Sequence, residues 1–304
     1  MSASSAPASA SLTVGWIGLG AMGAPMARVT AQAGHAVNAF DMNPASVQSV
    51  APDVEAAASA QDAARGADVV VIMVATGPQL MSVLFGEHGI AEVLTPSTTV
   101  MVMATVGPAE IDEAASQLAP FTTRVVDAPV SGGVARAGAG DLLVMVSGAD
   151  EDVTMVRPLL DAMASSAPVV GTAVGDGQRF KVVNQLLCGV HIAAAGEALA
   201  LADSMGLDIA QVYEVLGAGA AQSFMFGDRG ARMVAGDFTD VRSALDIFVK
   251  DMGLVNSAAR AVEQQVPLAE AAAALYQRGH DEGAGRLDDS VVYQLLGGGT
   301  RSAD

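Results

Sequence analysis

The hydrophobic pattern changes once along the chain, near residue 175. Before this point, short apolar runs rich in β-branched residues alternate with segments of helical periodicity. Seven runs have this character: Thr13–Gly18, Ala36–Asp41, Val69–Ala75, Thr99–Ala104, Arg124–Ala128, Leu142–Ser147 and Val169–Thr172. Strands separated by helices are typical of βαβ units, which build a mainly parallel sheet. The sequence therefore predicts an α/β first domain over residues 12–174.

After Gly177 the pattern is purely helical. Gln178–Met205 contains no proline and few polar residues, which predicts one helix about 42 Å long at ~1.5 Å per residue. A helix that is apolar nearly all round has to be buried in a domain core or between subunits. Shorter helical patterns follow over Ile209–Leu216, Ala244–Val262, Leu268–Glu282 and Asp289–Leu296. We therefore expect an all-α second domain over residues 175–304, joined to the first by the long helix.

Composition narrows the class of protein. The formal net charge of −18 disfavours nucleic acid and anionic membrane as partners, because both bind basic patches. No uninterrupted apolar run approaches the ~18 residues of a membrane helix. The Ser/Ala-rich residues 1–11 contain no basic residue, so we expect a disordered tail there and not a secretory signal. The single cysteine, Cys188, cannot form an internal disulfide, which favours a reducing cytoplasm.

A glycine-rich turn follows the first predicted strand. Residues 18–23 read Gly-Leu-Gly-Ala-Met-Gly and open a helical pattern over Met22–Ala33. In a Rossmann-type domain these glycines allow a tight turn, a close approach of the backbone to a pyrophosphate, and close packing of helix on strand. The helix N-terminus then faces the phosphates. Any glycine-rich turn can match the motif by chance, but its position predicts five dinucleotide contacts: Gly18, Gly20, Ala21, Met22 and Gly23.

An acidic residue ends the second predicted strand. Asp41 follows Gly18 by 23 residues, where a carboxylate can accept hydrogen bonds from the ribose hydroxyls of NAD. The alternative role is capping of a helix ahead of Pro44. Because Phe40–Pro44 contains no arginine to bind a 2′-phosphate, we expect NAD and not NADP. Val74 and Ala75, at the end of the predicted strand Val69–Ala75, complete the expected contacts on this side.

Four blocks of sequence resemble the 3-hydroxyisobutyrate dehydrogenase, or β-hydroxyacid dehydrogenase, family. The first is Gly18–Ala27, which extends the glycine-rich turn; Asp127–Gly133 is similar to the family's substrate-binding block. Gly175–Gln185 resembles its catalytic block, and Lys250–Leu254 a block whose lysine approaches the cofactor. The resemblance covers residues 13–296. It implies a Rossmann-type domain followed by an all-α substrate and dimerisation domain, an NAD-dependent hydroxyacid dehydrogenase acting on a CH–OH group, and a homodimer or higher homo-oligomer.

The chain also departs from the family pattern. Where the family often has Asp-x-Ser-Thr, this sequence has Val102-Met103-Ala104-Thr105, so only Thr105 is carried over as a cofactor contact. The second asparagine of the catalytic block is Gln185. Local likeness is greatest to the sugar-acid members of L-threonate dehydrogenase type, which usually have histidine in place of Asn184.

Lys181 is the expected catalytic residue. On a helix that begins near Gly177, residues Gly177, Lys181, Asn184 or Gln185, and Cys188 share one face. The glycine would leave space for a ligand. A lysine inside an apolar pocket and beside an oxidised nicotinamide should have a pKa below its usual ~10.4, so the neutral amine can accept the hydroxyl proton. The alternative is a lysine at a helix end whose ammonium reaches solvent.

The remaining site residues are expected to bind substrate or cofactor. Ser131, Gly132 and Gly133 offer a hydroxyl and unobstructed backbone N–H groups for a carboxylate, although a simple turn uses similar residues. Asn184 and Gln185 would bind the substrate or orient the lysine. The resemblance implies a cofactor contact for Lys250, whose alternative is a surface ion pair with Asp246 one turn earlier. Side chains with metal-ligand spacing are not found, and no metal is expected.

Two other functions stay open. One is an imine-reducing relative of the same fold; such members typically lack a lysine at this position. The other is a non-catalytic dinucleotide-binding scaffold, against which the retention of Lys181 and Ser131 argues. For the substrate, a polyhydroxylated acid needs polar partners, whereas a branched acid of 3-hydroxyisobutyrate type needs an apolar wall. The candidate polar partners are Asn184, Gln185, Gln222 and Ser223. The candidates for an apolar wall are Phe224, Phe226 and Phe248.

Overall fold

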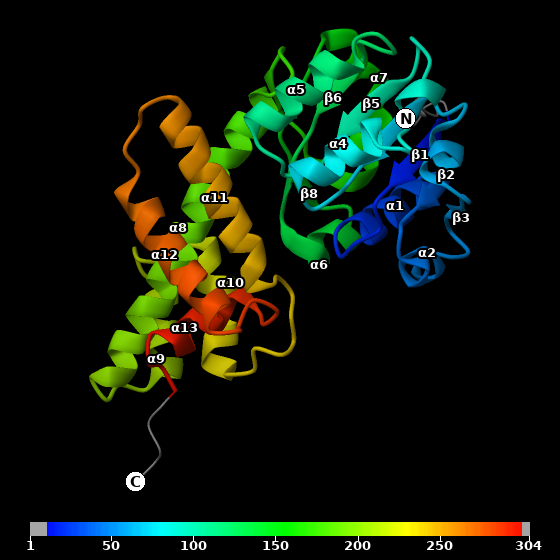
Figure 1. The fold of residues 1–304 in the computed structure, drawn as a ribbon. Helices are drawn as coiled ribbons and strands as arrows, with labels where there is room; N and C mark the ends of the chain where they lie inside the picture. The colour runs from blue at the N-terminus through cyan, green and yellow to red at the C-terminus, as the bar shows by residue number, and fades with distance from the viewer. Residues whose placement is uncertain (1–10, 300–304) are drawn as a thin grey trace, which may run out of the picture. The chain divides into compact units, whose positions relative to one another are not determined.

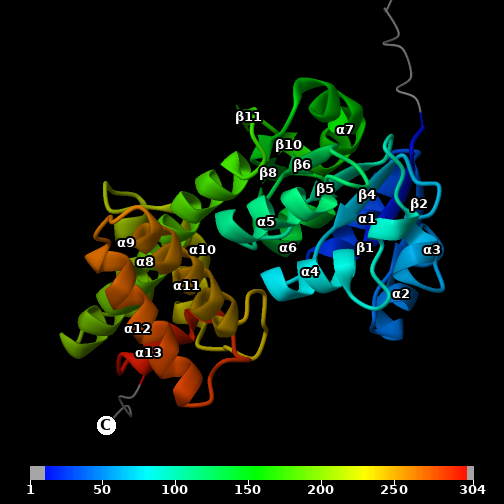
Figure 2. The ribbon, with the colours of Figure 1, turned by 45° about the horizontal axis from the view of Figure 1, so that its top comes forward.

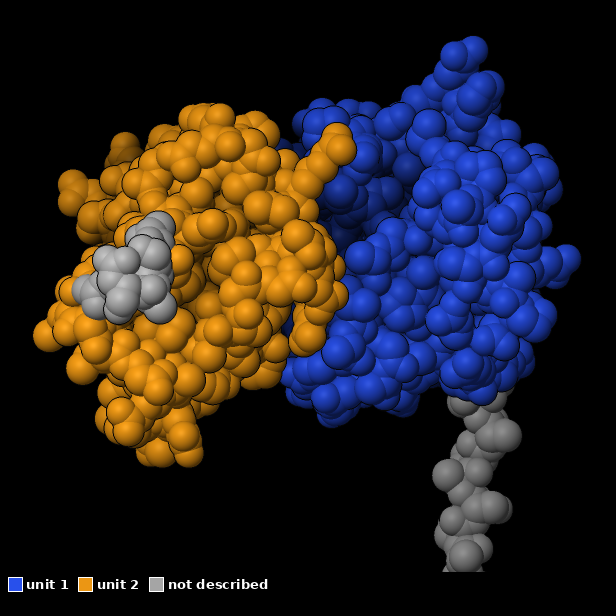
Figure 3. Space-filling model, turned by 90° about the horizontal axis from the view of Figure 1, so that it is seen from below, with its two compact units in different colours: residues 1–181 blue, residues 182–304 orange. Residues whose placement is uncertain are grey.

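The computed structural model describes residues 11–299 and contains two compact units that divide between Lys181 and Val182 (Figure 3). The division lies seven residues beyond the sequence-based boundary, inside a helix. Residues 1–10 of the expected tail lie outside the described residues. Ser11, its last residue, is described, and its hydroxyl donates to the carbonyl oxygen of Gly34 over 2.8 Å.

The first unit is built on an eight-stranded, mainly parallel sheet, as the sequence predicts. Its strands lie in the order β11-β9-β6-β5-β4-β1-β2-β3. Neighbours are parallel except β6 and β9, which pair antiparallel at Asp127 and Ser147. The strands are β1 Thr13–Ile17, β2 Ala36–Phe40, β3 Glu55–Ala56, β4 Val69–Ile72, β5 Thr99–Val102, β6 Val125–Asp127, β9 Val146–Ser147 and β11 Val169–Gly171.

Helices cover both faces of this sheet (Figures 1 and 2). Helices α1 (Gly23–Gln32) and α7 (Asp150–Met163) supply side chains to one apolar cluster. Helices α4 (Gly77–Phe85) and α5 (Pro108–Leu118) supply side chains to the other. Central strands such as β4 are therefore buried on both sides, which explains their uninterrupted apolar sequences. The shorter helices are α2 Pro44–Ser49, α3 Ala60–Ala64, η1 Ala91–Val93 and α6 Gly133–Gly138.

A second, three-stranded sheet was not expected from the sequence. It contains β10 (Ala164–Ser166), β8 (Leu142–Val144) and β7 (Val130–Ser131) in that order. The run predicted as one strand over Leu142–Ser147 is therefore two, since β8 belongs to the small sheet and β9 to the large one. A continuous apolar sequence does not reveal that the chain changes sheets at Met145.

Helix α8 spans Asp176–Ser204, 29 residues without interruption, close to the predicted range. With a mean hydropathy of 1.5 in its most apolar window it is long and apolar enough to cross a membrane, although half of that window is buried within the protein. Scattered polar residues kept it from standing out as an apolar run. Core helices of soluble proteins pass the same test.

The second unit is helical, as expected. It contains the rest of α8 together with α9 Ile209–Gly217, α10 Phe224–Ala235, α11 Leu245–Ala261, α12 Pro267–Asp281, η2 Asp289–Val291 and α13 Val292–Leu295. Phe248 and Tyr276 stack at its centre with 5.3 Å between ring centroids. The Tyr276 hydroxyl donates to the carbonyl oxygen of Gly189 over 2.8 Å, which ties α12 to α8.

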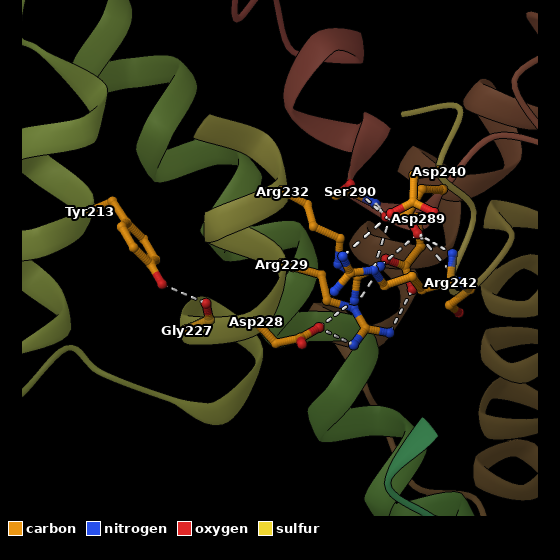
Figure 4. A network of polar contacts seen from close by, with 11 residues as sticks. Tyr213, Gly227, Asp228, Arg229, Arg232, Asp240, Arg242, Asp289 and Ser290 are labelled. Carbon is orange, nitrogen blue, oxygen red and sulfur yellow. Dashed lines mark hydrogen bonds and ion pairs between the residues drawn. The ribbon is translucent and has the colours of Figure 1, made fainter. Parts of the chain in front are cut away.

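An ion-pair network anchors α10, the helix that the hydrophobic pattern missed (Figure 4). Arg229 binds both carboxylate oxygens of the fully buried Asp289, over 3.1 and 2.9 Å. Arg232 binds Asp288 over 2.6 Å, and both arginines contact Asp228. Burial raises the pKa of Asp289 despite its arginine partner. Because an uncompensated buried charge costs about 3–5 kcal/mol, these pairs hold α10 against η2.

Candidate active site

The glycine-rich turn after β1 has the geometry of a phosphate-binding loop. Gly18 has φ +99°, and a Cβ there would lie 2.2 Å from the carbonyl oxygen of Met73. A Cβ on Gly23 would lie 2.1 Å from the carbonyl oxygen of Gly18, so only glycine lets α1 pack this close to the strand. A Cβ on Gly20 would meet no atom within 4 Å. The first and third glycines thus serve packing, and the second faces open space where a pyrophosphate can approach.

The sheet topology places this loop at a switch point. β1 has β2 on one side and β4 on the other, and in open parallel sheets ligands bind at the carboxyl ends of strands where the order reverses. Val74 and Ala75 follow β4 at the same edge. They lead into α4, whose capping residue Thr76 exchanges hydrogen bonds with Gln79.

Asp41 lies at the end of β2 and contacts the loop directly. One carboxylate oxygen accepts from the backbone N–H of Leu19, and the other from the N–H of Asn43, each over 2.7 Å. The capping role considered for Asp41 belongs to Asn43, whose side chain accepts from the N–H of Ala45 at the start of α2. A carboxylate has about four acceptor sites, so Asp41 can hold the loop and still accept from two ribose hydroxyls.

Ser131, Gly132 and Gly133 connect β7 to α6. Gly132 and Gly133 have φ values of +142° and +76°, and a Cβ on Gly133 would meet nothing within 4 Å. The side chain of Arg136 packs against Gly132, but its guanidinium pairs with Asp141 over 2.9 Å. Binding of a carboxylate at this turn would therefore depend on the Ser131 hydroxyl and the backbone N–H groups.

Lys181 is buried, with 6% of its surface exposed. It lies one turn after Gln178, whose backbone N–H donates to a carboxylate oxygen of Asp127 over 2.8 Å. Burial raises the pKa of Asp127 to about 6, against the opposing effect of hydrogen bonds from Gln178. Gly177 does not leave space for a ligand as the sequence suggested. A Cβ there would lie 2.6 Å from the carbonyl oxygen of Met145 and 2.9 Å from that of Asp127.

In the second unit a chain of polar contacts links three other expected site residues, Asn184, Gln185 and Lys250. The amide of Asn184 donates to the Gln185 side-chain oxygen over 2.8 Å, and Gln185 in turn donates to Asp251. The Lys250 ammonium lies 3.0 Å from the other oxygen of Asp251. Asp246, the other candidate partner of Lys250, contacts the His280 ring over 2.7 Å.

Three proposed pocket residues have structural roles. Phe226 and Phe248 are buried in the core of the second unit, and the Ser223 hydroxyl accepts from the N–H of Phe226 as the cap of α10. Cys188 packs partly buried against the same core, as interpreted.

Two residues with polar contacts at the site, Gln178 and Asp251, were missed from the sequence, although Gln178 lies within the catalytic block and Asp251 beside Lys250. Among residues 11–299, no group of three or more His, Cys, Asp or Glu side chains could hold a metal.

Two family models together match nearly the whole chain. The NAD-binding domain of 6-phosphogluconate dehydrogenase matches residues 13–175, and the NAD-binding domain of NADP-dependent 3-hydroxyisobutyrate dehydrogenase matches residues 175–296. Together with the loop geometry, these matches define a nicotinamide-dinucleotide-dependent oxidoreductase of the Rossmann class. The chain belongs to the 3-hydroxyisobutyrate dehydrogenase family and is a dehydrogenase that binds NAD or NADP and acts on the hydroxyl group of a small hydroxy acid.

Curated relatives and solved structures agree with this assignment. L-threonate dehydrogenase of Haemophilus influenzae is 38% identical, with 94% of this chain and 95% of the relative covered. NAD-dependent L-serine dehydrogenase of Pseudomonas aeruginosa is 32% identical, with 93% and 97% covered. A crystal structure described as 3-hydroxyisobutyrate dehydrogenase from Salmonella typhimurium is 40% identical, covers 93% of this chain and 99% of its own, and superposes with a TM-score of 0.86.

Proposed function

We propose that this protein is an NAD-dependent dehydrogenase of a short, polyhydroxylated carboxylic acid, with Lys181 as general acid and base. The observation that carries the proposal is the buried Lys181, which lies one turn beyond the point where α8 is anchored to the carboxyl end of β6. A buried lysine needs a reason, and proton transfer from the substrate supplies one. The dinucleotide loop and Asp41 lie in the same unit.

The reaction is balanced between a hydride and a proton. The bound nicotinamide supplies the acceptor for the hydride that leaves the substrate carbon. The neutral amine of Lys181 accepts the hydroxyl proton, so the C–H and O–H bonds break while the carbonyl double bond forms. In the reverse direction the ammonium returns the proton to the carbonyl oxygen. We propose that Thr105 and Lys250 contact the dinucleotide.

Substrate binding requires local attraction in a protein of net charge −18. We propose that Ser131 and the N–H groups of Gly132 and Gly133 bind the carboxylate. Asn184 and Gln185 would bind hydroxyl groups along the rest of the molecule. The chain from Asn184 through Gln185 to Asp251 supports this choice, because it fixes the orientation of both amides. Each buried hydroxyl left without a partner would cost about 1–3 kcal/mol.

A panel of hydroxy acids tests the proposal. With NAD, L-threonate should give a higher kcat/KM than 3-hydroxyisobutyrate and L-serine, because the amides of Asn184 and Gln185 can pair with its additional hydroxyl groups. Relatives of 38 and 39% identity are named L-threonate dehydrogenase. Formation of NADH is followed by absorbance. A preference for 3-hydroxyisobutyrate would contradict the choice of substrate branch alone. Activity confined to uncharged alcohols would contradict the carboxylate site, and NADH formation from none of the acids would favour a binding scaffold.

The imine-reducing alternative has no specific support. Three imine reductases share the fold at TM-scores of 0.60 to 0.62, with 16–22% identity, which shows likeness of fold only. The lysine that such members typically lack is present here as Lys181. A reductase assay with a cyclic imine and NADPH should therefore give no turnover above background.

We also propose that the protein is at least a homodimer in the cytoplasm, built through the second unit. Large apolar side chains are exposed along α8 in the single chain: Leu187 is 50% exposed and Leu201 60%, and Met205, which follows the helix, is 67% exposed. A groove of about 490 Å³ between α8 and α12 is lined mainly by alanine, valine and leucine. Exposed apolar surface of this kind marks an interface.

Light scattering should give at least twice the chain mass of 30.5 kDa. Leu201→Glu should lower the measured mass, because it places a charge on the proposed interface. A monomeric mass for the unmodified protein would contradict the proposal.

A further inference from the structure

Gln178 makes more long-range hydrogen bonds than a structural side chain in a helix needs. Its side-chain oxygen accepts from the backbone N–H of Val106 over 3.1 Å and from that of Gly107 over 3.0 Å. Its side-chain nitrogen donates to the carbonyl oxygen of Ala104 over 3.0 Å and to Asp127 over 2.8 Å. A primary amide has two donors and two acceptor sites, so all four are used. The side chain is fully buried.

Asp127 holds the same residue from a second direction. One carboxylate oxygen accepts from the Gln178 side chain and the other from its backbone N–H. The N–H of Gly177 donates to the Ser147 hydroxyl over 2.9 Å. These contacts satisfy N–H groups in the first turn of α8 that have no partner within the helix. The start of α8 is therefore fixed to the ends of β6 and β9.

Gln178 joins α8, which carries Lys181, to the segment 104–107, which carries Thr105. Both Lys181 and Thr105 belong to the proposed site. Ala104 and Val106 flank Thr105, so the amide holds the backbone on both sides of the proposed cofactor contact. Lys181 is one turn further along α8. All of these residues belong to the first unit, and the partners lie 51 to 74 residues away from Gln178 in sequence.

We propose that Gln178, held by Asp127, is a positioning residue. It fixes the position of Lys181 on α8 relative to the backbone segment 104–107, which contains Thr105. The inference rests on the proposed function of Lys181. The hydride and the proton leave the same CH–OH group of the substrate. The nicotinamide and the Lys181 amine therefore have to be correctly positioned at the same time. A displacement of about 1 Å can cost about 10²-fold in rate. An apolar side chain at position 178 would leave two N–H groups, a carbonyl and a carboxylate without partners.

A reciprocal pair of substitutions tests this. Gln178→Glu keeps the acceptor for Val106 and Gly107 but places an oxygen against both Asp127 and the Ala104 carbonyl. The double variant, which also carries Asp127→Asn, repairs only the contact with residue 127, so we expect a partial recovery. Asp127→Asn alone sets its new N–H₂ against a donor of Gln178. In the double variant the N–H₂ of residue 127 donates to the carboxylate at 178, and its carbonyl still accepts from the backbone N–H. The double variant therefore still contains one buried carboxylate, now at position 178 and no longer at position 127.

We expect each single variant to lower kcat by about 10²-fold and the double variant to recover at least about tenfold of this loss. The KM for NAD should change by less than about threefold, and the urea midpoint should also recover in the double variant. The deuterium isotope effect on kcat should rise in Gln178→Glu and return toward the original value in the double variant, because misplacement slows the hydride step.

Gln61→Met is the matched control. Gln61 lies in the same unit and donates to the carbonyl oxygen of Gly89 over 2.9 Å, but that contact joins segments outside the proposed site. It should lower the urea midpoint and leave kcat and the isotope effect unchanged. A double variant no more active than Gln178→Glu, or a Gln178→Glu variant with unchanged kcat, would overturn the inference. Retained activity in a Lys181 variant would instead overturn the proposed function, so the two failures are separable.

Discussion

Lys181→Met should lower kcat by about 10²–10⁴-fold while the affinity for NADH stays close to that of the unmodified protein. General acid–base groups contribute rate factors of about this size, and the methionine fills a similar volume in the buried position. The measurement is kcat with the best acid of the panel, together with NADH binding followed by nucleotide fluorescence.

The control for this prediction is Arg65→Met, which removes an exposed cation from the same unit. It should leave kcat unchanged. If Lys181→Met kept most of its kcat over the whole pH range, Lys181 would have a structural role. If NADH affinity fell with kcat in proportion, the lysine would act through cofactor binding and not through proton transfer.

Asp41 should give a preference for NAD over NADP of at least about 10²-fold in kcat/KM. A 2′-phosphate would meet the carboxylate, and like charges brought together at an interface cost several kcal/mol. Asp41→Asn should narrow the preference because it removes the charge. It should also weaken NAD binding, since the amide can replace only one of the two acceptors that hold Leu19 and Asn43.

Asp53→Asn is the matched control for Asp41. Asp53 is an exposed carboxylate that pairs with Arg28 in the same unit, so its loss changes the net charge equally. Its cofactor preference should equal that of the unmodified protein. Equal turnover with NAD and NADP before any substitution would show that Asp41 does not select the cofactor.

The sequence predicted the order of the fold well because its strongest signals are periodic. The buried strands of the parallel sheet are apolar on both faces, and α8 contains no proline, so both patterns stand out. The two-residue strands β3 and β7 are too short to show a period. Helix α10 was missed because its inner face carries Arg229 and Arg232, which are buried only because Asp288 and Asp289 pair with them.

The candidate site was predicted less evenly. The roles of Gly18 and Gly23 follow from the spacing of the motif, and the structure shows the close contacts that require glycine. Gly177 was misread because its neighbours, Met145 and Asp127, come from strands that are distant in sequence. Partners of this kind cannot be read from a local pattern. For the same reason the links from Gln178 to Ala104 and from Gln185 to Asp251 became apparent only in three dimensions.

The continuity of α8 has a consequence for how this segment can change in length. Lys181 ends the first unit while Asn184 and Gln185 begin the second, yet all three lie in one uninterrupted helix. Along such a helix each residue adds about 1.5 Å and about 100° of rotation. An insertion of one residue between Lys181 and Asn184 would therefore move Asn184 from about 60° on one side of the lysine to about 40° on the other, and would move Gln185 to about 140°, off the lysine's face. Insertions or deletions between Lys181 and Gln185 therefore change which of these three side chains share a face of α8, unless they add or remove about a full turn.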